Sequence, residues 1–194
     1  MKRIFLKSTV AVTTCLLLIS FTFNKVEKKS VDASKSSIEW FAAKITGKHN
    51  GTINLKSGSL LFEENKLVGG EFVVDMTTIV CVDLKDKIEL KKRFETDLNS
   101  DNFFSVKNFP ESSFKITSIG TIAPNKYKVT GDLTIRGVTL ENSCILQFEN
   151  NKAQGTLVVD RTKYGMTLRS GSVFENLGNR VVYDEFEIKL SLVF

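Results

Sequence analysis

Histidine is almost absent from this sequence, since His49 is the only one among its 194 residues. A site built from two histidines is therefore excluded, and a Ser-His-Asp or Cys-His arrangement would have to use His49. This residue lies in 47–51, a stretch typical of a turn or a strand edge, with no nucleophile motif beside it. Zinc needs three or four ligands, and His49, Cys81 and Cys144 lack ligand spacing. We therefore expect a protein that is not an enzyme, with no catalytic residue, cofactor or metal site.

An excess of charge is also missing from most of the chain. The 27 Lys and Arg residues outnumber the 22 Asp and Glu residues, but six of the basic and one of the acidic residues fall within 1–29. Residues 30–194 then carry 21 of each sign. Binding of nucleic acid requires a basic patch on the folded domain, and this balance gives no support for one. We expect no nucleic-acid partner.

Cysteine is scarce as well. Outside the first 29 residues only Cys81 and Cys144 occur. In an exported protein they could form a disulfide, but sequence separation does not show whether their Cα atoms come close enough. The alternative, which we favour, is two small buried thiols, because free cysteine is among the most buried residue types.

No apolar run is long enough for a comfortable membrane span. The run at 10–23 has about fourteen residues, whereas a spanning helix needs about twenty. It follows Lys2, Arg3 and Lys7, and a positive start before an apolar stretch is typical of a secretory signal peptide. Because no clear cleavage site follows, residues 1–29 are predicted as a signal peptide or an uncleaved anchor, and Cys15 fits lipidation poorly. We expect a periplasmic or secreted bacterial protein, or one anchored to a membrane by this segment.

Alternation of apolar and polar residues dominates the rest of the chain. Within 126–135, Tyr127, Val129, Leu133 and Ile135 alternate with lysine, threonine and aspartate. A period of two indicates strands with one dry face and one wet face, as in antiparallel sheets. The same pattern, strong or weak, covers further segments: 37–45, 51–56, 58–63, 67–76, 112–119, 138–148, 152–160 and 185–192.

Short turns separate these predicted strands. Turn residues occur at Lys56-Ser57-Gly58, Asn65-Lys66, Pro124-Asn125 and Asn150-Asn151. A meander of this length must curl and close, because open strand edges invite aggregation. We therefore predict an all-β protein, namely a closed antiparallel β-barrel of about eight strands that follows a Lys/Ser-rich linker at 24–35.

Two segments depart from the alternation. Residues 83–98 place Leu84, Ile88, Phe94 and Leu98 at helical spacing among charged residues, which predicts one amphipathic helix across an end or side of the barrel. Residues 161–179 are predicted as a long loop, and long loops in compact domains are often lids or rims. Both segments are candidates for a gate.

The predicted inner face of the barrel mixes large and small residues. Phenylalanine is abundant, with 15 copies, and it brings a large apolar area without a polar group. Small residues fall on the same faces, namely Gly51, Gly70, Gly131, Ala153 and Gly155. They either leave a cavity beside the phenylalanines or relieve bends at barrel corners. The pattern alone does not choose between these interpretations.

Two arginines stand at the ends of strongly apolar strands, Arg136 after Ile135 and Arg161 after Asp160. At a barrel rim, such a cation could meet an anionic head group. The alternative is a structural ion pair, for instance with Asp160 or Asp75. The sequence leaves both interpretations open.

Several segments together resemble the YceI-like family. They are 47–53, 69–79, 98–106 followed by Phe109-Pro110 and Ser113-Phe114, 131–139, and 160–165. Each segment is weak evidence alone, but five in the right order are more specific, and the resemblance covers residues 36–194. Cys81 is a departure, because the family pattern does not require it.

The resemblance implies a lipocalin-like, exported barrel that binds a polyisoprenoid chain or another long apolar lipid inside and carries or stores it, with transient membrane contact. The alternative is a filled barrel that acts as an interaction or stress-response module, while an enzyme acting on a quinone-like isoprenoid is disfavoured by the single histidine. The oligomeric state is not indicated. Arg136 and Arg161 would lie at the rim, and the expected apolar pocket comprises Phe72, Val74, Met76, Ile79, Phe103, Phe104, Phe114, Leu133, Ile135, Phe174 and Phe186.

Overall fold

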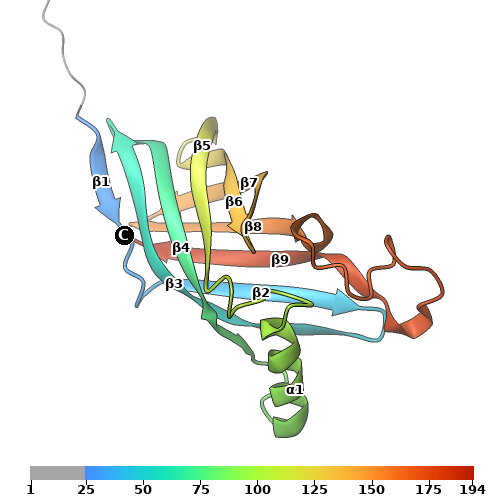
Figure 1. Cartoon of the computed structure of the whole chain (residues 1–194). Coiled ribbons are helices and arrows are strands. Elements are labelled where there is room, and N and C mark those ends of the chain that lie inside the picture. Colours follow the sequence, from blue (N-terminus) through green and yellow to red (C-terminus); the bar gives the residue numbers. More distant parts are fainter. Residues whose placement is uncertain (1–24) are drawn as a thin grey trace, which may run out of the picture.

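The computed structural model describes residues 25–194, so residues 1–24 of the leader predicted at 1–29 lie outside the described residues. Residues 27–29 of that predicted leader belong to a strand. The described chain forms nine strands, one α-helix and two short 3-10 helices (Figure 1). The strands are β1 (Glu27–Ser30), β2 (Ser37–Lys44), β3 (Gly47–Glu63), β4 (Lys66–Cys81), β5 (Glu111–Ala123), β6 (Lys126–Ile135), β7 (Val138–Glu149), β8 (Lys152–Asp160) and β9 (Val182–Val193). The helices are α1 (Ile88–Asn99), η1 (Arg161–Tyr164) and η2 (Gly178–Arg180).

The sheet closes on itself. All neighbours pair antiparallel in the order β3-β2-β9-β8-β7-β6-β5-β4, and β4 returns to pair with β3. This last pairing, from Gly51 opposite Cys81 to Glu63 opposite Lys66, makes a barrel of eight strands. The predicted all-β barrel with one helix is thereby confirmed.

Three tight hairpins, β3–β4, β5–β6 and β7–β8, turn at one end of the barrel. Glu64-Asn65 and Asn150-Asn151 both have positive φ, which is the geometry of the hairpin turns that match the right-handed twist of strands. Asparagine tolerates this left-handed region better than most residues, because its short side chain can bond locally. The predicted turns at 124–125 and 150–151 are confirmed, and the turn near 65 lies one residue earlier than predicted.

The turn predicted at Lys56-Ser57-Gly58 was wrong, because these residues lie inside the 17-residue strand β3. A register shift between Leu55 and Ser57 against β4 bends the strand without ending it. Gly58 faces Phe72, whose ring carbon would lie 2.7 Å from a Cβ at that position. A glycine and a bulge thus mark a bend in the barrel wall and not a hairpin.

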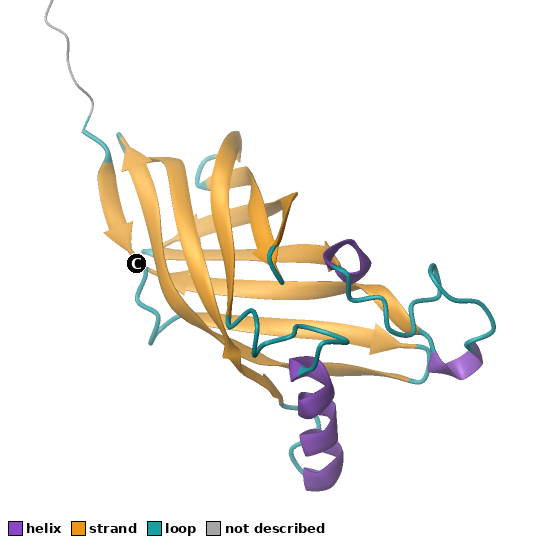
Figure 2. Ribbon diagram, viewed as in Figure 1, coloured by secondary structure: helices purple, strands orange, loops and turns teal. Residues whose placement is uncertain are grey.

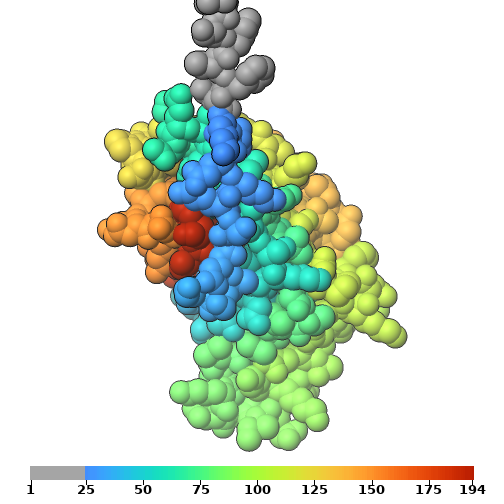
Figure 3. Space-filling view, turned by 90° about the vertical axis from the view of Figure 1, so that its left-hand side faces the viewer, coloured from blue at the N-terminus to red at the C-terminus, as the bar shows by residue number. Residues whose placement is uncertain are grey.

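The linker predicted at 24–35 was also wrong in part. Residues 27–30 form β1, which pairs antiparallel with the second half of β3. The following turn is held by backbone bonds from Val31 N–H to Gly58 O and from Asp32 N–H to Val193 O. Figure 3 shows residues 25–35 (blue) lying beside the C-terminal strand (red). This segment is therefore part of the barrel wall.

The two ends of the barrel differ. One end, where the hairpins β3–β4, β5–β6 and β7–β8 turn, is packed with aromatic rings: Phe62, Tyr127, Phe148 and Phe194 lie with neighbouring ring centroids 5.6–5.9 Å apart. The other end carries α1 and the segment 161–181, which Figure 2 shows as helix and loop outside the strands. We call the first the closed end and the second the mouth.

The helix is shorter than predicted, beginning at Ile88 and not at residue 83. Leu98 is buried and Phe94 packs against the core, as the helical pattern requires. Ile88, however, is 74% exposed, while Leu84 is buried from the turn that precedes the helix. Across residues 25–194, no helix has the length and apolar character needed to span a membrane.

Close packing explains the inward glycines. A Cβ on Gly51 would meet the ring of Trp40 at 2.5 Å, and one on Gly131 would lie 2.4 Å from the carbonyl oxygen of Lys115. The space beside these glycines is therefore taken by aromatic rings and neighbouring backbone. At these two positions the glycines thus do not leave cavity space, and they permit a close approach of neighbouring groups that neither sequence interpretation had named.

Gly131→Ala should destabilise the barrel by about 2–3 kcal/mol, because the added methyl group would clash with backbone that is held in the strand pairing. Urea unfolding followed by circular dichroism measures this change in the free energy of unfolding. Gly47→Ala is the matched control, since nothing lies within 4 Å of its Cβ position, and it should change stability by less than about 0.5 kcal/mol. Equal stability of the two variants would contradict the packing account.

Candidate functional site

The barrel encloses an apolar cavity of about 200 Å³. Side chains from strands β2 to β9, from α1 and from the segments at the mouth line this cavity. It reaches from Lys44 and Tyr183 at the mouth to Leu192, the second-last residue of β9, so it runs along most of the barrel. The side chains of the barrel do not fill this space, as the alternative of a filled barrel would require.

The structure brings together nearly all of the residues predicted for the pocket. Those that line the cavity are Phe72, Val74, Met76, Ile79, Phe103, Phe104, Phe114, Leu133, Ile135 and Phe186. Phe174 is the exception: it does not line the cavity and is 47% exposed on the segment beyond η1. Its backbone N–H donates to Ser170 O, 3.0 Å away, in a local turn.

The predicted site residues make up only about a third of the residues that line the cavity. Trp40, Leu55, Val129 and Leu190 all line the cavity. Their alternation on strands that were correctly predicted is the signal that could have identified them, since one face of each strand must point inward. Phe94 also lines the cavity, from α1, and stacks near Trp40 with ring centroids 6.3 Å apart.

Two polar atoms in the cavity wall have no hydrogen-bond partner in the described part of the protein. They are the indole nitrogen Nε1 of Trp40 and the hydroxyl Oγ of Ser112. Trp40 is 6% exposed and Ser112 is 8% exposed. Buried polar groups are nearly always paired, so both atoms call for an explanation.

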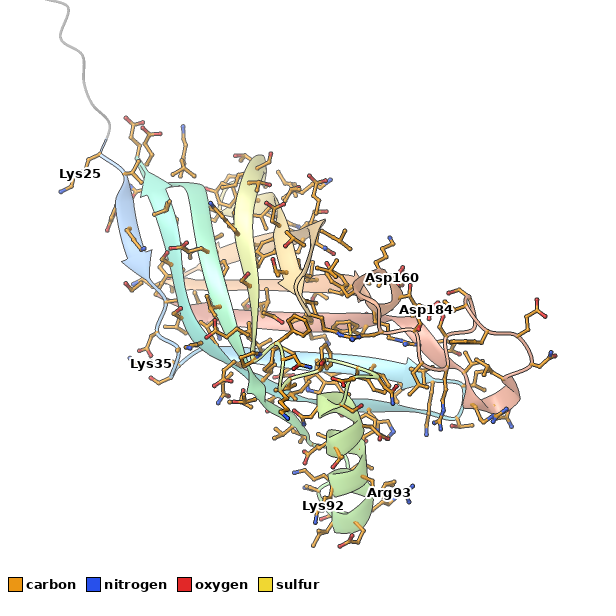
Figure 4. The ribbon with its side chains drawn as sticks, in the orientation of Figure 1. Lys25, Lys35, Lys92, Arg93, Asp160 and Asp184 are labelled. Carbon is orange, nitrogen blue, oxygen red and sulfur yellow. The ribbon has the colours of Figure 1, made fainter. Side chains whose placement is uncertain are left out.

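Arg161 lies at the mouth, but it is buried, with 4% of its surface exposed. Its guanidinium group donates hydrogen bonds to the carbonyl oxygens of Tyr183, Met166 and Val182 and pairs with Asp184 at 3.4 Å. Burial lowers the pKa of this group from its ordinary value, and the nearby carboxylate of Asp184 opposes that shift. Figure 4 shows Asp160 and Asp184 close together at this end of β8 and β9.

Asp160 caps the short helix η1, in which Arg161 is the first residue. Its carboxylate accepts hydrogen bonds from the N–H and hydroxyl groups of Thr162, which starts the 3-10 turn η1. The turn directs the Arg161 side chain across the start of β9. The ion pair suggested with Asp160 therefore forms with Asp184 instead, and the arginine chiefly ties the segment 166–184 together.

Arg136 has a similar structural role on the other side of the mouth. It is half-buried and donates to the carbonyl oxygens of Gly165 and Asp101, at 3.2 and 3.1 Å. It thereby links the β6–β7 turn to η1 and to the segment after α1. Neither Asp75 nor Asp160 is its partner.

A polar cluster that the sequence did not predict joins β3, β4 and the chain that leads into α1. His49 Nδ1 lies 2.9 Å from Asp83 Oδ2, the Cys81 thiol donates to Asp83 Oδ1 at 3.1 Å, and Asn50 N–H donates to the same oxygen. Burial raises the pKa of Asp83, but these hydrogen bonds outweigh it and leave that pKa lower than usual. His49, Cys81 and Asp83 place one potential metal ligand each within 4.8 Å of one another.

The three groups already satisfy one another as hydrogen-bond partners, which accounts for their closeness without an ion. The strand pairing that sets Cys81 opposite Gly51 brings His49 near, although 32 positions separate the two residues. Cys81 and Cys144 are both free and buried, so the favoured interpretation of two separate thiols is confirmed. Burial is the main cause that raises the pKa of Cys81 to about 12 and that of Cys144 to about 11.

A closed antiparallel barrel of eight strands around an apolar cavity, plugged at one end and covered by a helix at the other, defines a lipocalin-like barrel. Within that class, the YceI-like domain matches residues 30–194. The chain belongs to the YceI-like family, as its sequence segments had indicated. The match begins six residues before the predicted domain boundary at 36 and includes the end of β1.

Solved structures share this fold at low sequence identity. BcnA from Burkholderia cenocepacia is 23% identical, with a TM-score of 0.62, over 84% of this chain and 99% of that one. A polyisoprenoid binding domain from Saccharophagus degradans, described as implicated in plant cell wall breakdown, is 14% identical with a TM-score of 0.55, over 84% and 95%. The YCEI protein of Campylobacter jejuni is 15% identical with a TM-score of 0.50, over 98% and 96%. No curated protein matches the sequence.

Arg161→Lys should destabilise the protein by about 3 kcal/mol, because lysine cannot reproduce the fork of donors and leaves buried carbonyl groups unpaired. Thermal and urea unfolding measure the loss. The control is Arg180→Lys, since Arg180 is exposed and bonds only to Leu177 O at 3.4 Å. If both variants lost the same stability, Arg161 would not have the structural role assigned to it.

Cys81 and Cys144 should resist alkylation by iodoacetamide at pH 8 in the folded protein. The reactive thiolate forms only as pH rises toward the pKa, and both values lie well above the ordinary value of about 8.5. Peptide mapping by mass spectrometry should find both residues modified once urea unfolds the chain. Rapid modification of either thiol in the native state would contradict the buried, protonated state.

Proposed function

We propose that this protein binds a long apolar lipid of the polyisoprenoid type inside its barrel and carries or stores it, without making or breaking a covalent bond. The observation that carries the proposal is the apolar cavity of about 200 Å³ along most of the barrel. An apolar space of this kind in a single domain favours an apolar occupant, as cavities lined by aliphatic and aromatic residues do generally.

The energetics favour a long chain over a small molecule. Each buried CH2 group contributes about 0.8 kcal/mol, so one five-carbon isoprene unit contributes about 4 kcal/mol. Association and ordering together oppose binding by about 4–15 kcal/mol. About three or four buried units are thus enough to give net affinity, whereas a single unit is not. The extension of the cavity towards the closed end suits such a chain.

The comparison with the domain from Saccharophagus degradans gives independent support. That protein is described as binding polyisoprenoid, and its fold covers 84% of this chain. At 14% identity the likeness shows a shared barrel, and the apolar wall of this chain supplies the chemical reason for extending the ligand class to it.

The surroundings of the mouth support transient contact with a membrane. Val173 and Phe174 are both about half-exposed on the segment beyond η1. A pair of exposed apolar side chains near the entrance would favour contact with a lipid surface during loading or release. A carrier of this kind would operate in the periplasm or outside the cell, where the predicted leader at 1–29 would direct it.

Native mass spectrometry of protein produced with its leader in a bacterial periplasm tests the proposal. We expect an adduct that organic extraction releases as a polyisoprenoid or another long apolar lipid. Protein without an adduct should take up added prenyl compounds. Absence of extractable lipid together with no uptake of any prenyl compound would rule out a lipid carrier.

Leu133→Trp should reduce lipid uptake at least about tenfold while the barrel stays folded, because the larger ring occupies the cavity that Leu133 lines. Asp132→Trp is the matched control, since Asp132 is the next residue along β6 and points outward. It should bind as the unmodified protein does. Titration with a fluorescent prenyl analogue measures both, and unchanged uptake in Leu133→Trp would place the binding site elsewhere.

A further inference from the structure

The proposed lipid binding gives no function to the polar cluster of His49, Cys81 and Asp83. This cluster lies where β4 ends and the chain turns towards α1 (Figure 1). Each residue contributes one atom, a ring nitrogen, a sulfur or a carboxylate oxygen, and the three atoms lie within 4.8 Å of one another. All three kinds of atom are ligands for transition metals. Within residues 25–194, no other histidine, cysteine and carboxylate groups come together in this way.

The backbone holds the three side chains in defined positions. Cys81 pairs with Gly51 across β4 and β3, and Val82 N–H donates to Asn50 O at 2.9 Å. Asn50 N–H in turn donates to Asp83 Oδ1 at 2.9 Å. The ligand atoms therefore come from two paired strands and from the residues just beyond them. Such rigid supports allow an ion to bind without a large rearrangement of the chain.

The distances within the cluster are near those between the ligands of a bound ion. His49 Nδ1 lies 2.9 Å from Asp83 Oδ2, and Cys81 Sγ lies 3.1 Å from Asp83 Oδ1. Tetrahedral zinc has bonds of about 2.0–2.3 Å to nitrogen, oxygen and sulfur, which places its ligand atoms about 3.3–3.7 Å apart. Side-chain rotations that open each contact by about half an ångström would make room for the ion.

The hydrogen bonds that join the three groups do not prevent binding. Zinc deprotonates a thiol that coordinates it, so the ion replaces the proton between Cys81 and Asp83, and this proton passes to the solvent. The imidazole of His49 stays neutral, with its proton on Nε2. One thiolate and one carboxylate then balance the double charge of the ion. A partly buried site without net charge avoids the cost of an unpaired buried charge.

Access and ligand type both favour zinc over other common divalent ions. The side chains of His49 and Asp83 are 18% and 27% exposed, so an ion can reach them from solvent, whereas Cys81 is fully buried. Magnesium and calcium require oxygen ligands, and this set has one nitrogen and one sulfur. With three protein ligands, the fourth position of a zinc ion is filled by water.

We propose that His49 Nδ1, Cys81 Sγ and the Asp83 carboxylate bind one zinc ion at the mouth of the barrel. The spacing of these residues in the sequence did not indicate the site, because strand pairing brings His49 to Cys81. His49 also borders the cavity and lies against Phe94 of α1, with ring centroids 4.5 Å apart. The bound ion therefore fixes a ring that lies between the barrel wall and the helix. The site does not rest on the proposed lipid binding.

Zinc binding is measured on protein that is produced with its leader, carries no affinity tag and has been treated with a chelator. Native mass spectrometry counts the ions on each chain, and isothermal titration calorimetry gives the Kd. Cobalt(II) is a second probe, because its bond to a thiolate gives a strong absorption band in the near ultraviolet. We expect one ion per chain, a cobalt–thiolate band, and a Kd in the micromolar range, weaker than that of a four-ligand structural site.

Substitution of each ligand tests the assignment. Cys81→Ser, His49→Gln and Asp83→Asn should each weaken zinc binding at least about a hundredfold, which exceeds the usual effect of losing an outer-shell partner. Cys81→Ser should also abolish the cobalt–thiolate band. Two controls should bind zinc as the unmodified protein does: Cys144→Ser removes the other buried thiol, and Asp86→Asn removes an exposed carboxylate close by in the chain.

A stability measurement separates loss of the site from loss of the fold. Circular dichroism in chelator checks that each variant is folded, and Cys81→Ser keeps a hydroxyl that can donate to Asp83. Zinc at about a hundred times its Kd should raise the Tm of the unmodified protein by about 5–10 °C and leave that of Cys81→Ser unchanged. If one ligand variant does not fold, the other two still decide the outcome. No binding up to about 1 mM zinc, or binding that persists undiminished in the folded ligand variants, would overturn the proposal.

Discussion

The pairing of β3 with β4 is the constraint on which the rest of the structure depends. These two long strands are neighbours in sequence, and they also form the seam at which the sheet closes. Closure leaves no free edge in the eight-stranded barrel and turns one face of every strand inward. The bulge near Leu55 and Ser57 bends both strands over the lumen. Without this seam, the inward residues would face water and no cavity would exist.

Closure also assigns different tasks to the two ends. At the closed end the chain can pack rings tightly, and Phe62, Phe148 and Phe194 do so. At the mouth, longer connections must cross the opening, and each is fastened by a polar group that bonds to backbone. Arg161 and Arg136 donate hydrogen bonds to carbonyl groups. Asp83 accepts one from Asn50 N–H and also contacts the side chains of His49 and Cys81. The polar residues that the sequence offered as site candidates, such as Arg136, Arg161 and His49, therefore form hydrogen bonds that fix the segments at the mouth.

The polar groups near the cavity contribute little to its wall. Almost every buried polar group there has a partner within residues 25–194, with Trp40 Nε1 and Ser112 Oγ as the exceptions, and neighbouring atoms occlude both of these. A ligand would therefore meet an almost entirely apolar surface of aliphatic and aromatic side chains from β2 to β9. The proposed function follows from this lining and from the volume that it encloses.

The sequence by itself determined the class of fold and about a third of the cavity wall. Period-two alternation is enforced by burial of one face, so the strands, their inward residues and pocket members such as Phe72 and Leu133 could be predicted. Segment order also indicated the family. Only the tertiary structure decided that Lys56–Gly58 bends a strand, that residues 27–30 join the sheet, that Phe174 lies outside the cavity, and that Arg161 pairs with Asp184. These outcomes depend on contacts between residues far apart in the chain, and local periodicity carries no information about such contacts.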